Sequence, residues 1–170
     1  LQHLSNEGQQ VFKTKRVSDT LKRIGHCDIE VLPCLVMDDP WYYRNKVQVP
    51  VGNKDGHLIS GFYKQHSNDI VEMDHCFIQN EDSNQLVKRV RELLELYNEV
   101  PYDKVKRTGN IRHILVKYAN TNKELMLVLI IYKDNVKQLD KIVKTLKNEF
   151  SNLKTVVLNI NKRHDNCSCR

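Results

Sequence analysis

The sequence predicts an α+β fold in which a mainly antiparallel sheet is covered by packed helices. Three observations support this prediction. Apolar residues alternate with polar ones in some segments, they recur every three to four residues in others, and the resulting order is helix, strands, helix, hairpin, helix, strand. With 170 residues, of which 40% are hydrophobic and 28% charged, the chain is long enough and apolar enough to bury the core of such a fold.

The first predicted element is a helix over residues 7–24, where Val17, Leu21 and Ile24 recur at helical spacing. Lysine and arginine residues occupy its other side. That side could face phosphates, but the spacing favours the ordinary solvated side of an amphipathic helix.

A strand is predicted over residues 43–51, because Val47, Val49 and Val51 alternate with Lys46, Gln48 and Pro50. Pro50 lacks a backbone N–H, so we expect it at a strand end or edge. Residues 52–56 have the composition of a hairpin loop, the returning strand is placed at 57–63, and a short extended piece is placed at 69–73.

The second half of the chain is more regular. A helix capped by Asp82 or Ser83 is predicted from an apolar stripe that consists of Leu86, Val90, Leu93, Leu94 and Tyr97. A hairpin follows over residues 111–119 and 125–132, and its continuous apolar second strand is expected to be central. After Asp134 or Asn135 comes a helix with the stripe Val136, Leu139, Val143, Leu146 and Phe150, and the last strand is predicted at 155–160.

Composition narrows the class of function. The formal net charge of +6 and a pI near 9.0 favour a polyanionic partner, although a merely solvated basic surface explains the charge equally well. No apolar run is long enough for a membrane span, so no membrane partner is expected. An odd number of cysteines, five, without a secretory signal favours reduced thiols in a cytoplasmic protein. The six glycines are scattered and form no phosphate-binding or dinucleotide-binding loop.

Two local clusters could bind a ligand. His75 and Cys76, with His164, Cys167 and Cys169, could ligate a metal, but a buried cysteine and a frayed terminus are the simpler interpretation. The aromatic and basic run at residues 41–46, which begins with Trp41, is the best local hint of nucleic-acid contact, because rings stack on bases while cations neutralise phosphates. Aromatic residues that open a strand are also common in cores and interfaces.

Six segments together resemble bacterial uracil-5 RNA methyltransferases, the 23S rRNA enzymes most closely. They lie, in the family's order, at residues 1–4, 43–51, 61–63, 70–76, 111–114 and 158–161. The Tyr-Arg-Asn-Lys run at 43–46 and the context of Cys76 are the most specific of them. The resemblance extends to about Asn166 and concerns the middle of the family's proteins, so together with the absence of an initial methionine it indicates a piece of a longer protein.

The resemblance implies a domain organisation and two cofactors. Residues 1–25 would be the N-terminal helix that follows the cluster cysteines, residues 26–166 the central α+β RNA-binding domain, and residues 167–170 a tail outside the family pattern. The doubly wound methyltransferase domain, which binds S-adenosylmethionine and holds the catalytic residues, is absent. Cys76 would be one ligand of a [4Fe–4S] cluster in the longer protein. Neither cofactor is expected to be bound to this chain, which is expected to be inactive alone.

What remains is RNA recognition, with 23S rRNA as the leading candidate. Arg44, Lys46 and Gln48 would project from the polar face of their strand, and Lys64 and Arg112 would join them from neighbouring strands. The helix at residues 7–24 would lose a partner, so self-association through it or high mobility is expected. Two alternatives stay open: part of a tRNA uracil-5 methyltransferase, or a non-enzymatic RNA-binding module with a ferredoxin-like half, in which Cys76 is simply core.

Overall fold

Nine helices and strands follow one another along residues 3–163, which are the residues that the computed structural model describes. Two compact units contain them, Leu1–Trp41 and Tyr42–Arg170. In chain order the elements are α1 (Asn6–Arg23), β1 (Lys46–Lys54), β2 (His57–Tyr63), β3 (Ile70–Glu72), α2 (Glu81–Leu96), β4 (Ile111–Tyr118), β5 (Leu125–Ile131), α3 (Leu139–Glu149) and β6 (Leu153–Ile160). The predicted order of elements is confirmed.

The sheet of the second unit has six strands among the described residues, in the order β3-β2-β1-β4-β5-β6. Every neighbouring pair is antiparallel except β5 and β6, so the predicted mainly antiparallel sheet is confirmed. Asp55 and Gly56 both have positive φ, at 53° and 89°, and join β1 to β2 as a two-residue turn whose twist matches the strands. The β1 strand therefore continues to Lys54, whereas the sequence predicted a loop from residue 52.

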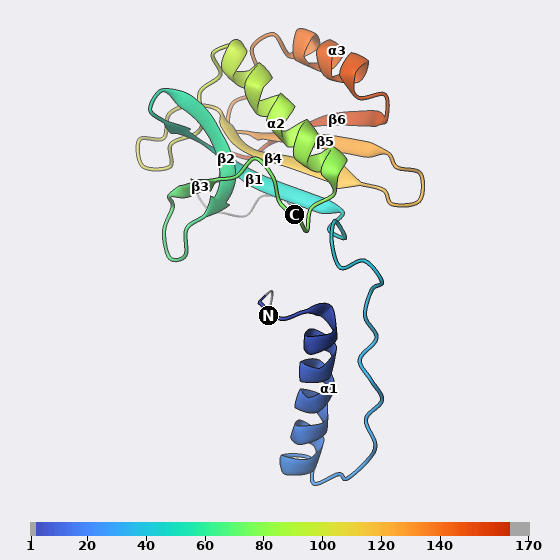
Figure 1. The fold of residues 1–170 in the computed structure, drawn as a ribbon. Helices are drawn as coiled ribbons and strands as arrows, with labels where there is room; N and C mark the ends of the chain where they lie inside the picture. Colours follow the sequence, from blue (N-terminus) through green and yellow to red (C-terminus); the bar gives the residue numbers. More distant parts are fainter. Residues whose placement is uncertain (1–2, 164–170) are drawn as a thin grey trace. The chain divides into compact units, whose positions relative to one another are not determined.

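Helices α2 and α3 cover one face of this sheet (Figure 1). The main core lies between this face of the sheet and the two helices. There the valines of β1, Val47, Val49 and Val51, belong to the same buried cluster as the apolar stripe of α2. Leu86, Val90 and Leu94 of that stripe are fully buried. From α3 the buried residues are Ile142 and Leu146. The period-two and period-3.6 patterns thus predict most of the core correctly. Val87 and Ile142 belong to the core as well, whereas Leu139 and Val143 of the predicted stripe are only partly buried.

The face of the sheet that points away from α2 and α3 holds a second, smaller apolar cluster formed by Leu115, Val128 and Ile130. Since β5 lies between β4 and β6 and is buried on both faces, all of its side chains are apolar. This explains why β5 shows no alternation in the sequence.

Some predicted positions differ from the structure. Pro50 lies in the middle of β1, not at its end, at the point where pairing with β4 stops and pairing with β2 starts. The cap of α2 is Asn80, whose side chain accepts a hydrogen bond from the Ser83 N–H, so Asp82 and Ser83 lie inside the helix.

Helix α3 starts at Leu139, later than the caps Asp134 and Asn135 would place it. The reason is that the backbone N–H groups of Lys133 and Lys137 donate to the side chains of Asn110 and Glu99, which holds this segment outside the helix. Gln138, with φ of 52°, then turns the chain into α3.

In the first unit, α1 is capped by Ser5 and contains no buried residue. Val17 and Ile24 of its predicted stripe are 50% and 76% exposed. The segment after α1 is attached to it through Cys34, whose carbonyl accepts from Gln10 and whose N–H donates to Thr14. Residues 26–41 therefore group with α1, whereas the sequence placed them with the sheet domain. Within residues 3–163, no helix combines the length and the apolar character that crossing a bilayer requires.

Candidate nucleic-acid interface

Lys46 and Gln48 lie on one face of β1, opposite the buried valines, as their alternation predicts. Arg44 is exposed but precedes the strand, and its backbone pairs with a distant segment: its N–H donates to the Ile78 carbonyl over 2.8 Å. The structure therefore places Lys46 and Gln48 together and sets Arg44 beside residues 78–80. Arg44 is held there because the Asn80 N–H also donates to the Arg44 carbonyl.

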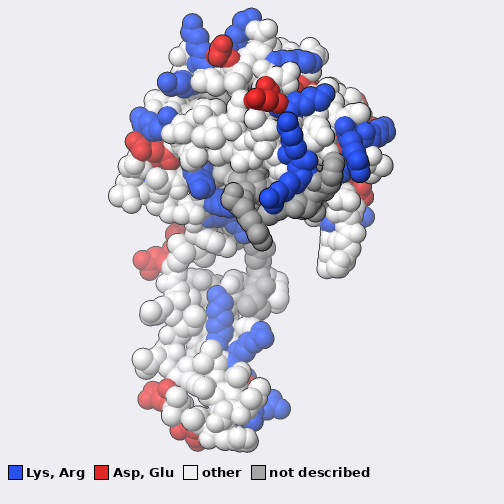
Figure 2. Space-filling model, turned by 180° about the vertical axis from the view of Figure 1, so that it is seen from behind, with Lys and Arg blue, Asp and Glu red and all other residues white. Residues whose placement is uncertain are grey.

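Three lysines line one shallow hollow on the open face of the sheet. Lys46 is the cross-strand partner of Lys117, and Met126 pairs with Lys117 on one side and Thr155 on the other, next to Lys154. Lys46, Lys117 and Lys154 are exposed, and the hollow also contains one carboxylate, Glu124. We call Lys46, Lys117 and Lys154 the lysine hollow. Figure 2 shows the molecule from this side, with more basic than acidic side chains on the surface.

Lys64 is exposed in the loop after β2 and is not among the residues that line the lysine hollow. Its backbone N–H donates to the Asp69 carbonyl over 2.8 Å, which closes the loop between β2 and β3. The β2 strand lies on the far side of β1 from β4. Lys64 is therefore accessible but separate from the lysine hollow.

Arg112 does not fit the predicted role of a surface phosphate contact, because its side chain is only 4% exposed. Its guanidinium donates to the backbone carbonyls of Asn161 and Arg163, at 2.9 and 2.6 Å, and lies 5.0 Å from the ring centre of Tyr102. A β-bulge between Ile111 and His113 displaces this part of β4 from regular alternation. Arg112 fastens the chain that follows β6 to β4.

The surroundings of Arg112 favour neutral side chains. Burial, with the charges of Arg112 and Lys104, lowers the pKa of His113 to about 4. Burial and Arg112 also lower the pKa of Lys104, whose ammonium lies 5.0 Å from the ring centre of Tyr63. Burial raises the pKa of the Tyr63 hydroxyl, although the charge of Arg112 opposes this. His113 is therefore uncharged in the folded protein at neutral pH.

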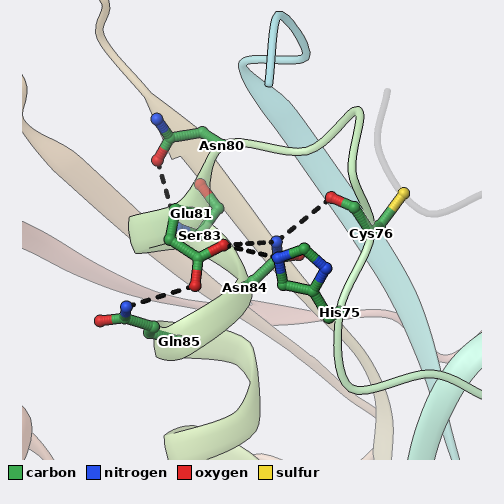
Figure 3. Close-up of polar contacts among 7 residues, drawn as sticks. All are labelled: His75, Cys76, Asn80, Glu81, Ser83, Asn84 and Gln85. Atoms are coloured by element: carbon green, nitrogen blue, oxygen red, sulfur yellow. Dashed lines mark hydrogen bonds and ion pairs between the residues drawn. The ribbon is translucent and has the colours of Figure 1, made fainter. Parts of the chain in front are cut away.

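Cys76 lies in the segment before α2, where polar contacts fix its backbone (Figure 3). Its carbonyl accepts from the Asn84 amide at 3.2 Å and from the Gln79 N–H at 3.0 Å. The sulfur points away from this network, and Cys76 is half-buried.

Glu81 connects the same network to α2. Its carboxylate accepts from the Asn84 and Gln85 amides and lies 2.8 Å from His75 Nε2. Burial raises the pKa of Glu81, but the hydrogen bonds outweigh burial, so its pKa lies below the ordinary value. The Glu81 carboxylate is therefore ionised when it holds the ring of His75.

Beside Cys76, three rings form an exposed aromatic cluster. His75 makes edge-to-face contacts with Tyr42, at a centroid distance of 6.1 Å, and with Phe77, at 4.8 Å. The Tyr42 N–H donates to the Phe77 carbonyl over 2.8 Å, which joins the run at residues 41–46 to the Cys76 segment. We call Tyr42, His75 and Phe77 the aromatic cluster.

Sequence reasoning missed three residues of these surfaces, Lys117, Lys154 and Phe77, and named His75 only as a possible metal ligand. Lys117 could have been found, since it alternates with the buried Val116 and Tyr118. Lys154, His75 and Phe77 reach their places through strand order and loop packing, which no local pattern shows.

No group of three or more His, Cys, Asp or Glu side chains within residues 3–163 could hold a metal ion. His164, Cys167 and Cys169, which the sequence offered as further ligands, lie outside the described residues. Of the metal ligands that the sequence suggests, only His75 and Cys76 therefore lie within the described residues.

Proteins similar to this chain are RNA methyltransferases. A protein of Listeria innocua called an uncharacterized RNA methyltransferase is 43% identical over 166 residues, and one of Bacillus cereus with the same description is 37% identical over 167. Each match covers 98% of this chain but 36% of the relative, so the chain spans about a third of those proteins. No family model matches the chain.

A solved structure gives the same fold. The chain aligns with a Pyrococcus abyssi tRNA (uracil-54, C5)-methyltransferase, crystallised with S-adenosyl-L-homocysteine, at a TM-score of 0.74 and 21% identity, over 99% of this chain and 38% of that one. The sequence relatives are named RNA methyltransferases, and the solved structure shares the fold of this chain. These names agree with the resemblance to RNA uracil-5 methyltransferases that the sequence predicted.

Proposed function

We propose that this chain is the RNA-recognition part of an enzyme that transfers a methyl group from S-adenosylmethionine to C5 of a uridine in 23S rRNA. The observation that carries the proposal is the lysine hollow, because three strands bring Lys46, Lys117 and Lys154 to one place. Clustered lysines on an exposed face suit the phosphates of folded RNA. The names of the relatives support RNA as the substrate of the whole protein.

Methylation at C5 needs a nucleophile that adds to C6 of uracil and thereby activates C5, a methyl donor, and a base that removes the proton. The target base must also leave its stack to enter a pocket. We assign these groups and S-adenosylmethionine to the part of the longer protein beyond this chain. Residues 26–166 would then serve as the central RNA-binding domain, with its sheet in the compact unit that begins at Tyr42 and with residues 26–41 as the connection from α1. Residues 1–25 would be the helix before this domain, and residues 167–170 a tail outside the family pattern.

Cys76 suits a single thiolate ligand of an iron–sulfur cluster, because its backbone is fixed and its half-buried sulfur points away from the polar network. A cluster takes four such ligands, so the others would come from outside residues 3–163. When bound, the cluster would tie Cys76 to those segments.

A tRNA substrate is the second candidate, and the structural neighbour favours it, since that protein is a methyltransferase for uracil 54 of tRNA. At 21% identity the neighbour indicates the fold of this chain but not its substrate. We therefore keep 23S rRNA, which the sequence resemblance suggests, as the first choice. A free-standing binding module is disfavoured because the relatives are methyltransferases of about three times this length. Methylation of purified 23S rRNA and of tRNA by the full-length protein separates the two substrates.

The salt dependence of RNA binding tests the lysine hollow. In the full-length protein, Lys46→Ala and Lys117→Ala should each flatten the slope of log Kd against log salt by about 0.7 to 0.9, because each removes one phosphate contact. Arg44→Ala should do the same. The matched control is Lys144→Ala on the exposed side of α3, which should leave the slope unchanged. If all four variants have the same slope as the unmodified protein, this face of the sheet does not bind the RNA phosphates.

A further inference from the structure

The aromatic cluster is an exposed apolar patch next to a basic surface. Phe77 is 63% exposed, Tyr42 is 39% exposed, and the His75 side chain is also 39% exposed. Large aromatic side chains normally bury most of their area, and Phe77 does not. Because Phe77 contacts the His75 ring, which in turn contacts Tyr42, the three rings indicate a surface that meets another molecule.

The rings are held in place before any ligand arrives. The His75 ring lies 2.8 Å from Glu81, whose own carboxylate is fixed by Asn84 and Gln85. The backbone that carries Phe77 is bonded to Tyr42, and Tyr42 has a φ of 53°, which is uncommon for a bulky residue. Backbone conformations of this kind persist only where the surroundings enforce them, and they concentrate at functional positions.

Cations lie within reach of the rings. Arg44 is exposed two residues after Tyr42, and Lys46 of the lysine hollow follows two residues later. Four residues of extended chain span at most about 14 Å, so the aromatic cluster and the lysine hollow lie close enough for one short stretch of nucleic acid. Aromatic rings bordered by cations bind unpaired strands, because bases stack on the rings while phosphates meet the charges.

We propose that Tyr42, His75 and Phe77 form a stacking platform for an unpaired base of the RNA whose phosphates the lysine hollow binds. This inference rests on the proposed function and adds to it that the recognised RNA is single-stranded at this point. A positively charged border favours RNA over an apolar protein partner, which would leave Arg44 and Lys46 desolvated without counter-charges.

The test uses the full-length protein and a single-stranded oligoribonucleotide that contains 2-aminopurine, with a fully paired duplex of the same sequence for comparison. Because a base gains affinity by stacking on an aromatic ring, Phe77→Leu should weaken single-strand binding about tenfold and reduce the fluorescence change of 2-aminopurine. Phe77→Trp should restore both. The salt slope should stay as in the unmodified protein, since no phosphate contact is lost.

Phe62→Leu is the matched control, because Phe62 is an exposed phenylalanine on β2. It should leave binding unchanged. If Phe77→Leu binds the single strand as tightly as the unmodified protein while the lysine variants still flatten the salt slope, the platform is wrong and the proposed function stands. If Phe77→Leu lowers thermal stability without altering RNA affinity, the cluster packs against protein and the platform is also wrong. If no variant affects RNA binding, both proposals fail.

Discussion

Individual residues of β4 show how burial changes what a charged side chain does. Arg112 and His113 both resemble polar surface positions in the sequence, yet they are 4% and 6% exposed. Two backbone carbonyls accept hydrogen bonds from the Arg112 guanidinium, whereas His113 stays neutral because burial and the nearby cations oppose its protonation.

The depressed pKa of His113 predicts that the protein loses stability in acid. The unfolded chain takes up the proton near pH 6.5, while the folded protein does so only near pH 4. The contribution of His113 to the free energy of unfolding is thus fully present above pH 6.5. As the pH drops from 6.5 towards 4, the free energy of unfolding falls by about 3 kcal/mol at most. Urea unfolding between pH 4 and 7 should show a shallower decline for His113→Gln.

His57→Gln provides the contrasting control for this experiment. A hydrogen bond and the charge of Glu95 raise the pKa of His57, so its contribution is complete below pH 6.5 and lost as the pH rises. Removing His57 should therefore leave the acid-side decline in place. An unchanged decline in His113→Gln would show that His113 is not the group responsible.

Among the helices and strands, the edge of the sheet depends on the absence of one side chain. Gly61 of β2 pairs with Glu72 of β3, and a Cβ at Gly61 would lie 1.9 Å from the Val71 carbonyl oxygen. The short β3 strand in turn leads into the segment that holds Cys76, which Arg91 of α2 anchors through Asp74 at 2.8 Å. The close approach at Gly61 therefore supports the position of the candidate surfaces.

We expect Gly61→Ala to separate β3 from β2 and to reduce the free energy of unfolding by more than about 2 kcal/mol. Gly56→Ala is the comparison, since no atom lies within 4 Å of a Cβ there and only the positive φ of 89° opposes the change, by about 1 kcal/mol. Denaturant melts of both variants measure the difference. Equal losses at the two glycines would mean that β3 does not pack as closely as described.

In the molecule as a whole, the apolar interior belongs to the second unit. Every residue of both buried clusters lies between Val47 and Leu158, and α1 has none. Since burial of apolar surface is the main force that stabilises a fold, the stability of the sheet should not depend on residues 1–41.

A shortened chain that spans Tyr42–Arg170 should therefore fold by itself. Its melting temperature should lie within about 4 °C of that of residues 1–170, because a change of 1 kcal/mol shifts a domain of this size by roughly that amount. Circular dichroism melts of the two chains make the comparison. A loss of cooperative unfolding in the shorter chain would show that the first unit completes the core.

The order of the elements and most of the core-facing residues could be predicted from the amino-acid sequence, because a strand or helix with one buried face repeats its apolar residues at a fixed period. The same period placed Lys46 and Gln48 correctly on the face of β1 opposite the buried valines. The cap of α2 and the start of α3 could not be predicted in this way. At the start of α3 the reason is that side chains distant in sequence, Glu99 and Asn110, compete for the backbone.

Which charges are available for binding depends instead on the three-dimensional arrangement. The fold buries Arg112, sets Lys64 apart, and brings Lys117 and Lys154 beside Lys46, because strand order and a β-bulge determine which residues meet across a sheet. It also joins Tyr42 to Phe77 across a gap in sequence that no local pattern spans. A side chain's pattern along the chain tells which way it points, but its neighbours in space decide whether it can bind anything.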